Sequence, residues 1–192
     1  DHLLLIEGTR PVEVHWAPSE TDDAIALWFP ADRLLYGGPA TPADSIPNVG
    51  TPLRTQRFTI RWADTLDRLS AFDAETLVTE FGPVVVGASA VRERLTMTAK
   101  ALRWLRNEVV ERMNRGMDEA EILADLDYTP ELFDHSWMAP TYGCADYIAR
   151  DLYREENGWW DRNPTSLHPA PPDEAAAAVF GSLADPAAVV TR

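Results

Sequence analysis

The chain has 192 residues, of which 45% are hydrophobic and 25% are charged, the proportions of a globular protein with room for one ordinary domain or two small ones. Its formal net charge of −14 and its pI near 4.6 argue against nucleic acid as a partner, because such a chain repels phosphate. The single cysteine, Cys144, excludes an intramolecular disulfide and a cysteine-based metal cluster.

The first residues, DHLLLIEGTR, begin with an acid and lack the basic region of a signal peptide. We expect a strand here that continues from an earlier segment. No apolar run approaches the ~18 residues of a membrane span. We therefore expect no membrane span and a cytoplasmic location; a periplasmic or secreted location stays open if an N-terminal segment is missing.

The following residues alternate in a way that predicts β-structure. Val12 and Val14 point to one side of a predicted strand, and Glu13 and His15 point to the other. Residues 24–38 contain two short apolar runs joined by Pro-Ala-Asp, which predicts a hairpin.

A long irregular segment, residues 37–55, is rich in Pro, Gly and Thr. Loops of this length in compact domains are often functional. Residues 61–72 then predict a helix that buries Trp62 and Leu69, and residues 75–87 predict a strand that runs into a turn.

From Ser89 onward the sequence has helical periodicity. Apolar residues recur at steps of three and four up to Met113, and Gly116 follows as a typical helix stop. Further helices are predicted at residues 117–126, after Thr129-Pro130, at residues 145–158 and from Pro172.

The most specific motif is GWWDRNPTSLHP, residues 158–169. It resembles the Gly-Trp-aromatic-Asp-x-Asn-Pro-x-x-Leu-His-Pro signature of the helical dimerisation domain of alkyl sulfatases, in the metallo-β-lactamase superfamily. Residues 113–132, MNRGMDEAEILADLDYTPEL, resemble the turn between helices of that domain. Residues 17–36, APSETDDAIALWFPADRLLY, resemble the second half of the hydrolase domain.

The resemblance covers nearly the whole chain and implies its fold. Residues 1–88 would be α/β, the C-terminal half of an αββα metallo-β-lactamase-like domain, and residues 89–192 an all-α dimerisation domain. The family begins its dinuclear zinc site with His-x-His-x-Asp-His, which has no counterpart among the four scattered histidines of this chain. The implied partners are a second copy in a homodimer and a second polypeptide that carries the N-terminal half of the hydrolase domain.

Three zinc ligands of the family fall on Glu20, Pro39 and Phe81 of this chain. Proline has no side-chain donor atom and a phenyl ring does not bind zinc, so Glu20 is the expected metal residue of a degenerate zinc site. The alternative is that Glu20 is a loop carboxylate, beside Asp22 and Asp23, that caps backbone amides.

The resemblance also implies substrate and interface residues. It places sulfate-ester contacts at Asn48 and Arg54, and it puts Tyr147 where the family has a histidine near its active site. Adjacent aromatic residues in a non-helical run predict an anchor, either in the core of one subunit or at a subunit interface, and the resemblance favours the interface. The predicted anchor residues are Trp159, Trp160, Asp161, Asn163 and His168.

Three functions remain open from the sequence. The first is part of an alkyl-sulfatase-like hydrolase that cleaves a sulfate or related ester with metal-activated water, the metal motif lying on a segment absent from this chain. The second is a metal-free pseudoenzyme or interaction module that keeps the dimerisation scaffold, which Pro39 and Phe81 favour. The third is metal-independent chemistry at Glu20–Asp23 or at the loop through Asn48 and Arg54.

Overall fold

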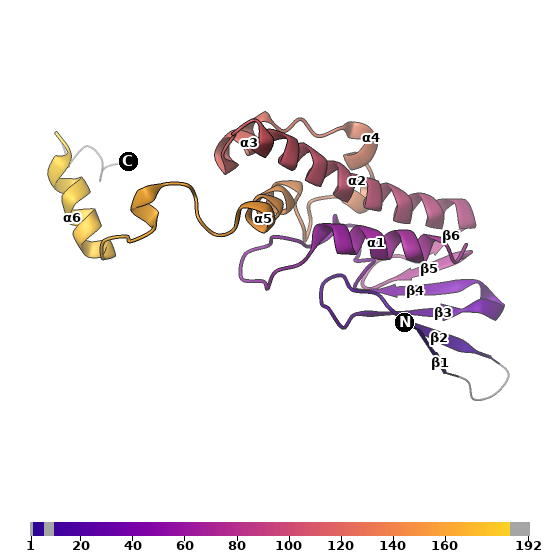
Figure 1. Ribbon diagram of the computed structural model, residues 1–192. Coiled ribbons are helices and arrows are strands. Elements are labelled where there is room, and N and C mark those ends of the chain that lie inside the picture. Colours follow the sequence, from indigo (N-terminus) through magenta and orange to yellow (C-terminus); the bar gives the residue numbers. More distant parts are fainter. Residues whose placement is uncertain (1, 6–9, 185–192) are drawn as a thin grey trace. The chain divides into compact units, whose positions relative to one another are not determined.

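The computed structural model describes residues 2–5 and 10–184 (Figure 1). The chain divides into two compact units, Asp1–Glu156 and Asn157–Arg192. No helix among the described residues is long and apolar enough to cross a membrane.

A six-stranded sheet forms the frame of the first unit. Its strands lie in chain order, and each is antiparallel to its neighbours except for β4 and β5, which are parallel. A parallel pair needs a crossover connection, and residues 39–58 together with helix α1 provide it. The strands are β1 (His2–Leu5), β2 (Val12–Trp16), β3 (Ile25–Phe29), β4 (Leu34–Gly38), β5 (Thr76–Thr79) and β6 (Val85–Val86).

Helices α1 (Thr59–Ser70) and α2 (Ala88–Asn114) pack against each other and against one face of the sheet (Figure 1). Trp62 and Leu69 of α1 are buried, as the sequence predicts. Leu102 lies in the middle of the buried stripe of α2 and is 0% exposed. The other helices are α3 (Glu119–Asp125), α4 (Pro130–Phe133), α5 (Ala145–Asn157) and α6 (Pro172–Ser182).

The two faces of the sheet differ in how completely they are covered. On the helix side, Trp28, Leu35 and Leu77 are at most 8% exposed. Directly paired residues share a face, so the strand register defines the opposite row. That row is almost entirely apolar, yet each of its side chains is partly or largely exposed. We call it the open face: Val12, Val14, Trp16, Ile25, Leu27, Phe29, Leu34, Tyr36 and Val78.

The second unit has no comparable core. None of its described residues, 157–184, is buried. Side-chain hydrogen bonds shape the turns before α6: the Asp161 carboxylate accepts from Asn163 N at 2.9 Å, and Asn163 Oδ1 accepts from Thr165 N at 3.1 Å. Helix α6 leaves Phe180 54% exposed.

Most of the predicted elements lie where the sequence placed them. The hairpin, the helix after the crossover loop and the later helices are confirmed. Two details differ. Residues 75–87 contain a second strand, β6, that pairs back on β5, and α2 begins at Ala88, after Gly87 with a φ of 104°, instead of at Ser89. The domain boundary at residues 88 and 89 stays a prediction.

Candidate functional site

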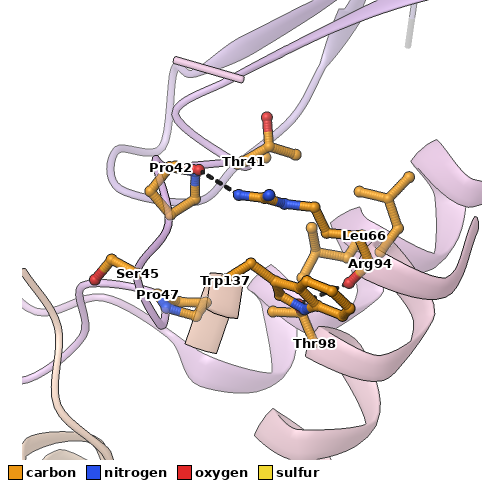
Figure 2. Close-up of a pocket in the computed structure, with 10 residues that line it drawn as sticks. Thr41, Pro42, Ser45, Pro47, Leu66, Arg94, Thr98 and Trp137 are labelled. Atoms are coloured by element: carbon orange, nitrogen blue, oxygen red, sulfur yellow. Dashed lines mark hydrogen bonds between the residues drawn. The ribbon is translucent and has the colours of Figure 1, made fainter. Parts of the chain in front are cut away.

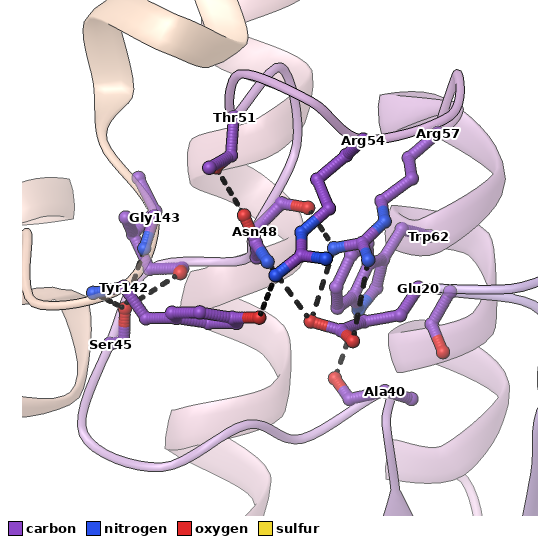
Figure 3. Close-up of polar contacts among 12 residues, drawn as sticks. Glu20, Ala40, Ser45, Asn48, Thr51, Arg54, Arg57, Trp62, Tyr142 and Gly143 are labelled. Atoms are coloured by element: carbon purple, nitrogen blue, oxygen red, sulfur yellow. Dashed lines mark hydrogen bonds and ion pairs between the residues drawn. The ribbon is translucent and has the colours of Figure 1, made fainter.

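The crossover loop, residues 39–58, is fixed to the segment that precedes α5 (Figure 3). Ser45 Oγ accepts hydrogen bonds from the backbone N–H groups of Tyr142 and Gly143, both at 3.0 Å. A Cβ atom on Gly143 would lie 2.5 Å from the carbonyl oxygen of Ile46, so only glycine permits this approach. The loop and the start of α5 therefore form one structural unit.

Arg94 of α2 holds the other part of the loop (Figure 2). Its guanidinium lies 3.0 Å from the Asp44 carboxylate and donates to the carbonyl oxygens of Pro42 at 3.3 Å and Ala43 at 3.1 Å. Burial lowers the pKa of Arg94, and the bond to Asp44 opposes this shift. The cavity beside Arg94 and Trp137 has a volume of about 20 Å³, room for about one water molecule, so we regard this cluster as structural.

Glu20, the predicted metal residue, lies against a guanidinium (Figure 3). Arg57 Nη1 is 3.1 Å from Glu20 Oε1 and also donates to the carbonyl oxygen of Asn48 at 2.5 Å. Asn48 Nδ2 lies 3.4 Å from Glu20 Oε1. Nearby, burial and then the charge of Glu20 raise the pKa of Glu80, while Arg57 lowers it. The Glu20 charge is thus balanced by a buried arginine.

These residues do not fit the zinc ions that the resemblance implies. No three His, Cys, Asp or Glu side chains gather in a metal-binding group anywhere in residues 2–5 and 10–184. Phe81 is 81% exposed and offers no donor atom. A zinc ion at Glu20 would also have to displace Arg57 or lie beside its positive charge. Within the described part of the chain, its own side chains therefore do not make a zinc site.

A groove of about 460 Å³ lies between the crossover loop and α5. This volume suits a small-molecule ligand. Arg54 contributes to the wall formed by the loop, and Glu119 contributes from α3. The wall formed by α5 carries Tyr147, Arg150 and Arg154, together with Asp151, at spacings of three and four residues that place them on one face of the helix.

Close backbone approach brings the two walls of the groove together. Gly50 has a φ of 71°, and a Cβ atom there would lie 2.1 Å from the carbonyl oxygen of Tyr147. Only glycine allows the loop to come this near to α5. On the same loop, Arg54 Nη2 donates to the Tyr142 hydroxyl at 3.2 Å (Figure 3). The position of Arg54 is thus set by the crossover loop and by the segment that precedes α5.

The charged groups of the helix wall have different partners. Arg150 Nη1 donates to Glu119 Oε1 at 2.8 Å. The buried Asp151 carboxylate accepts from Gln56 Nε2 at 2.7 Å. Burial raises the pKa of Asp151, an effect that the Gln56 hydrogen bond and then the charge of Arg154 oppose. Arg154 is exposed and has no hydrogen-bond or ion-pair partner among the described residues.

The structure brings together only some of the predicted site residues. Arg54 and Tyr147 both line the groove. Glu20, Asn48 and Arg57 form a group of contacting residues that we call the Glu20 cluster. Asn48 is 0% exposed, and its side chain also accepts a hydrogen bond from Thr51. The sequence interpretation missed Arg57 and Arg154; the helical spacing of the charged residues in α5 was the signal available for Arg154. The substrate and metal roles stay predictions.

The predicted anchor residues lie in the second unit. Within the second unit, Trp159 is 73% exposed. Trp160 Nε1 donates to the carbonyl oxygen of Asn163 at 3.0 Å, and Asp161 accepts from Ser166 at 2.7 Å. His168 is exposed. These contacts order the segment locally, and an anchor role in a dimer stays a prediction.

Known proteins show similarity over most of the chain. Residues 118–192 match the alkyl sulfatase dimerisation family. A linear primary-alkylsulfatase from Pseudomonas sp. is 33% identical over 174 residues, 89% of this chain and 33% of that protein. The solved structure of the stereoselective inverting sec-alkylsulfatase Pisa1 from Pseudomonas sp. has a TM-score of 0.86 at 24% identity, over 95% of this chain and 30% of that one. The chain thus spans about a third of the length of these alkylsulfatases.

A metallo-β-lactamase family protein from Thermus thermophilus shares the fold with a TM-score of 0.52 at 19% identity, over 81% of this chain and 48% of that one. The fold class predicted from the sequence is confirmed. A mixed sheet with helices, part of a metallo-β-lactamase-like fold, is followed by a helical region that matches the dimerisation domain.

Proposed function

We propose that this chain, which is homologous to alkylsulfatases and carries their dimerisation domain at residues 118–192, forms the C-terminal part of a sulfate-ester hydrolase. The similarity to an alkylsulfatase extends over 89% of the chain. Water activation by a metal then belongs to residues outside this sequence, on the same or on a second polypeptide. The part of the chain described here would bind and orient the ester.

The observation that carries this proposal is the open face. Its apolar side chains cross β2 to β5, and Trp16 and Ile25 are each 45% exposed. Burial of apolar surface contributes about 25 cal/mol per Å², so an uncovered row of this kind favours a further packing layer. In an αββα domain a second sheet provides that layer. The open face is therefore where we place the other half of the hydrolase domain.

Ester binding is assigned to the groove. The guanidinium of Arg54 offers the planar array of N–H donors that matches the oxygens of a sulfate group. Tyr147 adds a hydroxyl on the opposite wall. Asn48 is buried, so we assign it a positioning role: its contacts with Glu20 and Thr51 hold the loop that presents Arg54.

The second unit supports a homodimer. Trp159, Val179 and Phe180 are 73%, 63% and 54% exposed, and no described residue of this unit is buried. Aromatic and aliphatic side chains left uncovered in this way are typical of protein interfaces. We place the partner copy on this apolar surface.

Intact mass, metal content and sulfate release, measured on one sample isolated from the native cells by a C-terminal tag, test the proposal. We expect a longer or second polypeptide, about two equivalents of zinc per protomer and sulfate release from butyl sulfate. A lone 21.4 kDa chain without zinc or sulfate release would overturn it.

A second candidate is a metal-free interaction module that retains the dimerisation scaffold. The ion pair between Glu20 and the buried Arg57 favours it, because this pair neutralises the one retained ligand. A preparation that contains the complete hydrolase domain and still fails to bind added zinc would favour the module over the hydrolase.

A further inference from the structure

The arginines of the groove differ from most of the others. In this acidic protein, carboxylates within 4.0 Å pair with most arginines of the described residues. Arg54 and Arg154 are among the few without such a carboxylate, and both line the same groove. The others are Arg68, which donates to Thr65 and lies over the Trp16 ring, and Arg162, which donates to Asn157.

The balance of charge in the groove is positive. Arg54, Arg150 and Arg154 face it, and of these only Arg150 has a carboxylate partner, Glu119. The remaining acid, Asp151, is buried and bonded to Gln56, and burial raises its pKa. In a chain with a net charge of −14, a local excess of guanidinium groups marks a place that attracts an anion.

The α5 wall of the groove does not suit a plain alkyl chain, although Pro52 and Leu53 add apolar side chains to the loop wall. Pockets for such chains are lined mainly by aliphatic and aromatic side chains. The α5 wall instead presents one phenol, two guanidinium groups and one carboxylate, from Tyr147, Arg150, Arg154 and Asp151. A ligand that extends from Arg54 along this wall therefore contacts charged side chains.

We infer that the groove selects an organic sulfate ester with a second anionic group, a carboxylate, at its other end. This inference rests on the proposed function, since it takes Arg54 as the sulfate contact. Arg154 binds the carboxylate, and its unpaired guanidinium offers two parallel N–H donors to the two carboxylate oxygens. The substrate class is thus a short sulfooxy carboxylic acid.

Isothermal titration of the 192-residue chain with two esters of equal length tests this inference. The probes are sulfooxybutanoate, with sulfate and carboxylate at opposite ends, and butyl sulfate. We expect sulfooxybutanoate to bind roughly tenfold more tightly, as one additional charge-assisted contact predicts. Arg154→Gln should remove this preference, because it should lower the affinity for sulfooxybutanoate far more than the affinity for butyl sulfate.

The matched control is Arg106→Gln. Arg106 is an arginine that pairs with Glu156 and does not line the groove, so this variant should keep the preference. Circular dichroism verifies that each variant is folded. Equal affinities for the two esters would overturn the inference and leave the sulfate contact at Arg54 intact. An equal loss of affinity for both esters in Arg154→Gln would also overturn it, because Arg154 would then contribute to sulfate binding instead of carboxylate binding. Binding of neither ester by the folded chain would overturn the sulfate contact at Arg54 as well.

Discussion

The first unit of this molecule has a buried apolar core, and the described part of the second unit has none. In the first unit, Trp62 and Leu102 are 0% exposed and belong to one continuous core. In the described part of the second unit, 157–184, no residue is buried, and Trp159 stands 73% exposed. Because apolar burial is the main favourable term in folding, the first unit has its own source of stability, and the second gains most from a partner surface.

The largest expected effect comes from comparing the replacement of a buried tryptophan by alanine with the same replacement of an exposed one. Trp62→Ala removes a fully buried ring that also donates to the Ala40 carbonyl oxygen, and should lower the free energy of unfolding by about 3–5 kcal/mol. Trp159→Ala should change it by less than about 0.5 kcal/mol. Urea denaturation measures both. Similar losses of unfolding free energy in the two variants would contradict the distinction between a unit with a buried core and a unit without one.

The Glu20 cluster tests how much of the stability of the first unit is electrostatic. Glu20→Ala leaves the buried Arg57 without its carboxylate, and should cost about 3 kcal/mol of the free energy of unfolding. Adding Arg57→Met removes the orphaned charge and should recover much of that loss. An unchanged denaturation midpoint in Glu20→Ala would mean that the ion pair has no structural role, and it would favour the prediction that Glu20 is a metal ligand.

For the second unit the expected effect is on assembly. Phe180→Asp puts a charge on the exposed apolar surface and should weaken self-association at least tenfold, or about 1.4 kcal/mol. The unfolding of the first unit should stay the same. Sedimentation equilibrium gives the association constant. Phe81→Asp, at an 81% exposed site of the first unit, is the control and should leave dimerisation unaltered.

The smallest expected effect concerns pH. Burial raises the pKa of Asp151, so the folded state binds its proton more tightly than the unfolded state. Stability from this group is therefore highest below the ordinary pKa of an aspartate and falls as pH rises through the raised value. Asp151→Asn should lessen this fall and modestly raise the melting temperature at neutral pH. Thermal melts across pH measure it; a steeper fall in the variant would contradict the sign.

Local patterns account for what the sequence predicted well. The Pro-Ala-Asp turn, the buried stripe with Trp62 and the stop at Gly116, whose φ is 85°, depend on neighbouring residues alone. The second strand after the turn at residues 82–83 was missed because Val85 and Val86 are too few to show an alternating pattern.

The candidate site was harder to predict because its contacts join distant parts of the chain. Glu20 and Arg57 are 37 residues apart, and Arg54 and Tyr142 are 88 apart. The resemblance predicted roles for Arg54 and Tyr147, which both line the groove, but it could not show that Asn48 is buried. The resemblance could not predict the exposure of Trp159 either, because two adjacent tryptophans fit a core and an interface alike.

The clamping of the crossover loop has a consequence for ligand affinity. Arg94 holds its first half and Ser45 ties its middle to the backbone before α5, while Gly50 presses it against Tyr147. A free loop of this length would lose much conformational entropy when a ligand ordered it. This loop has already lost that freedom on folding. A ligand that binds in the groove therefore does not have to order this wall, and more of its contact free energy appears as affinity. This is the advantage of a pre-organised site.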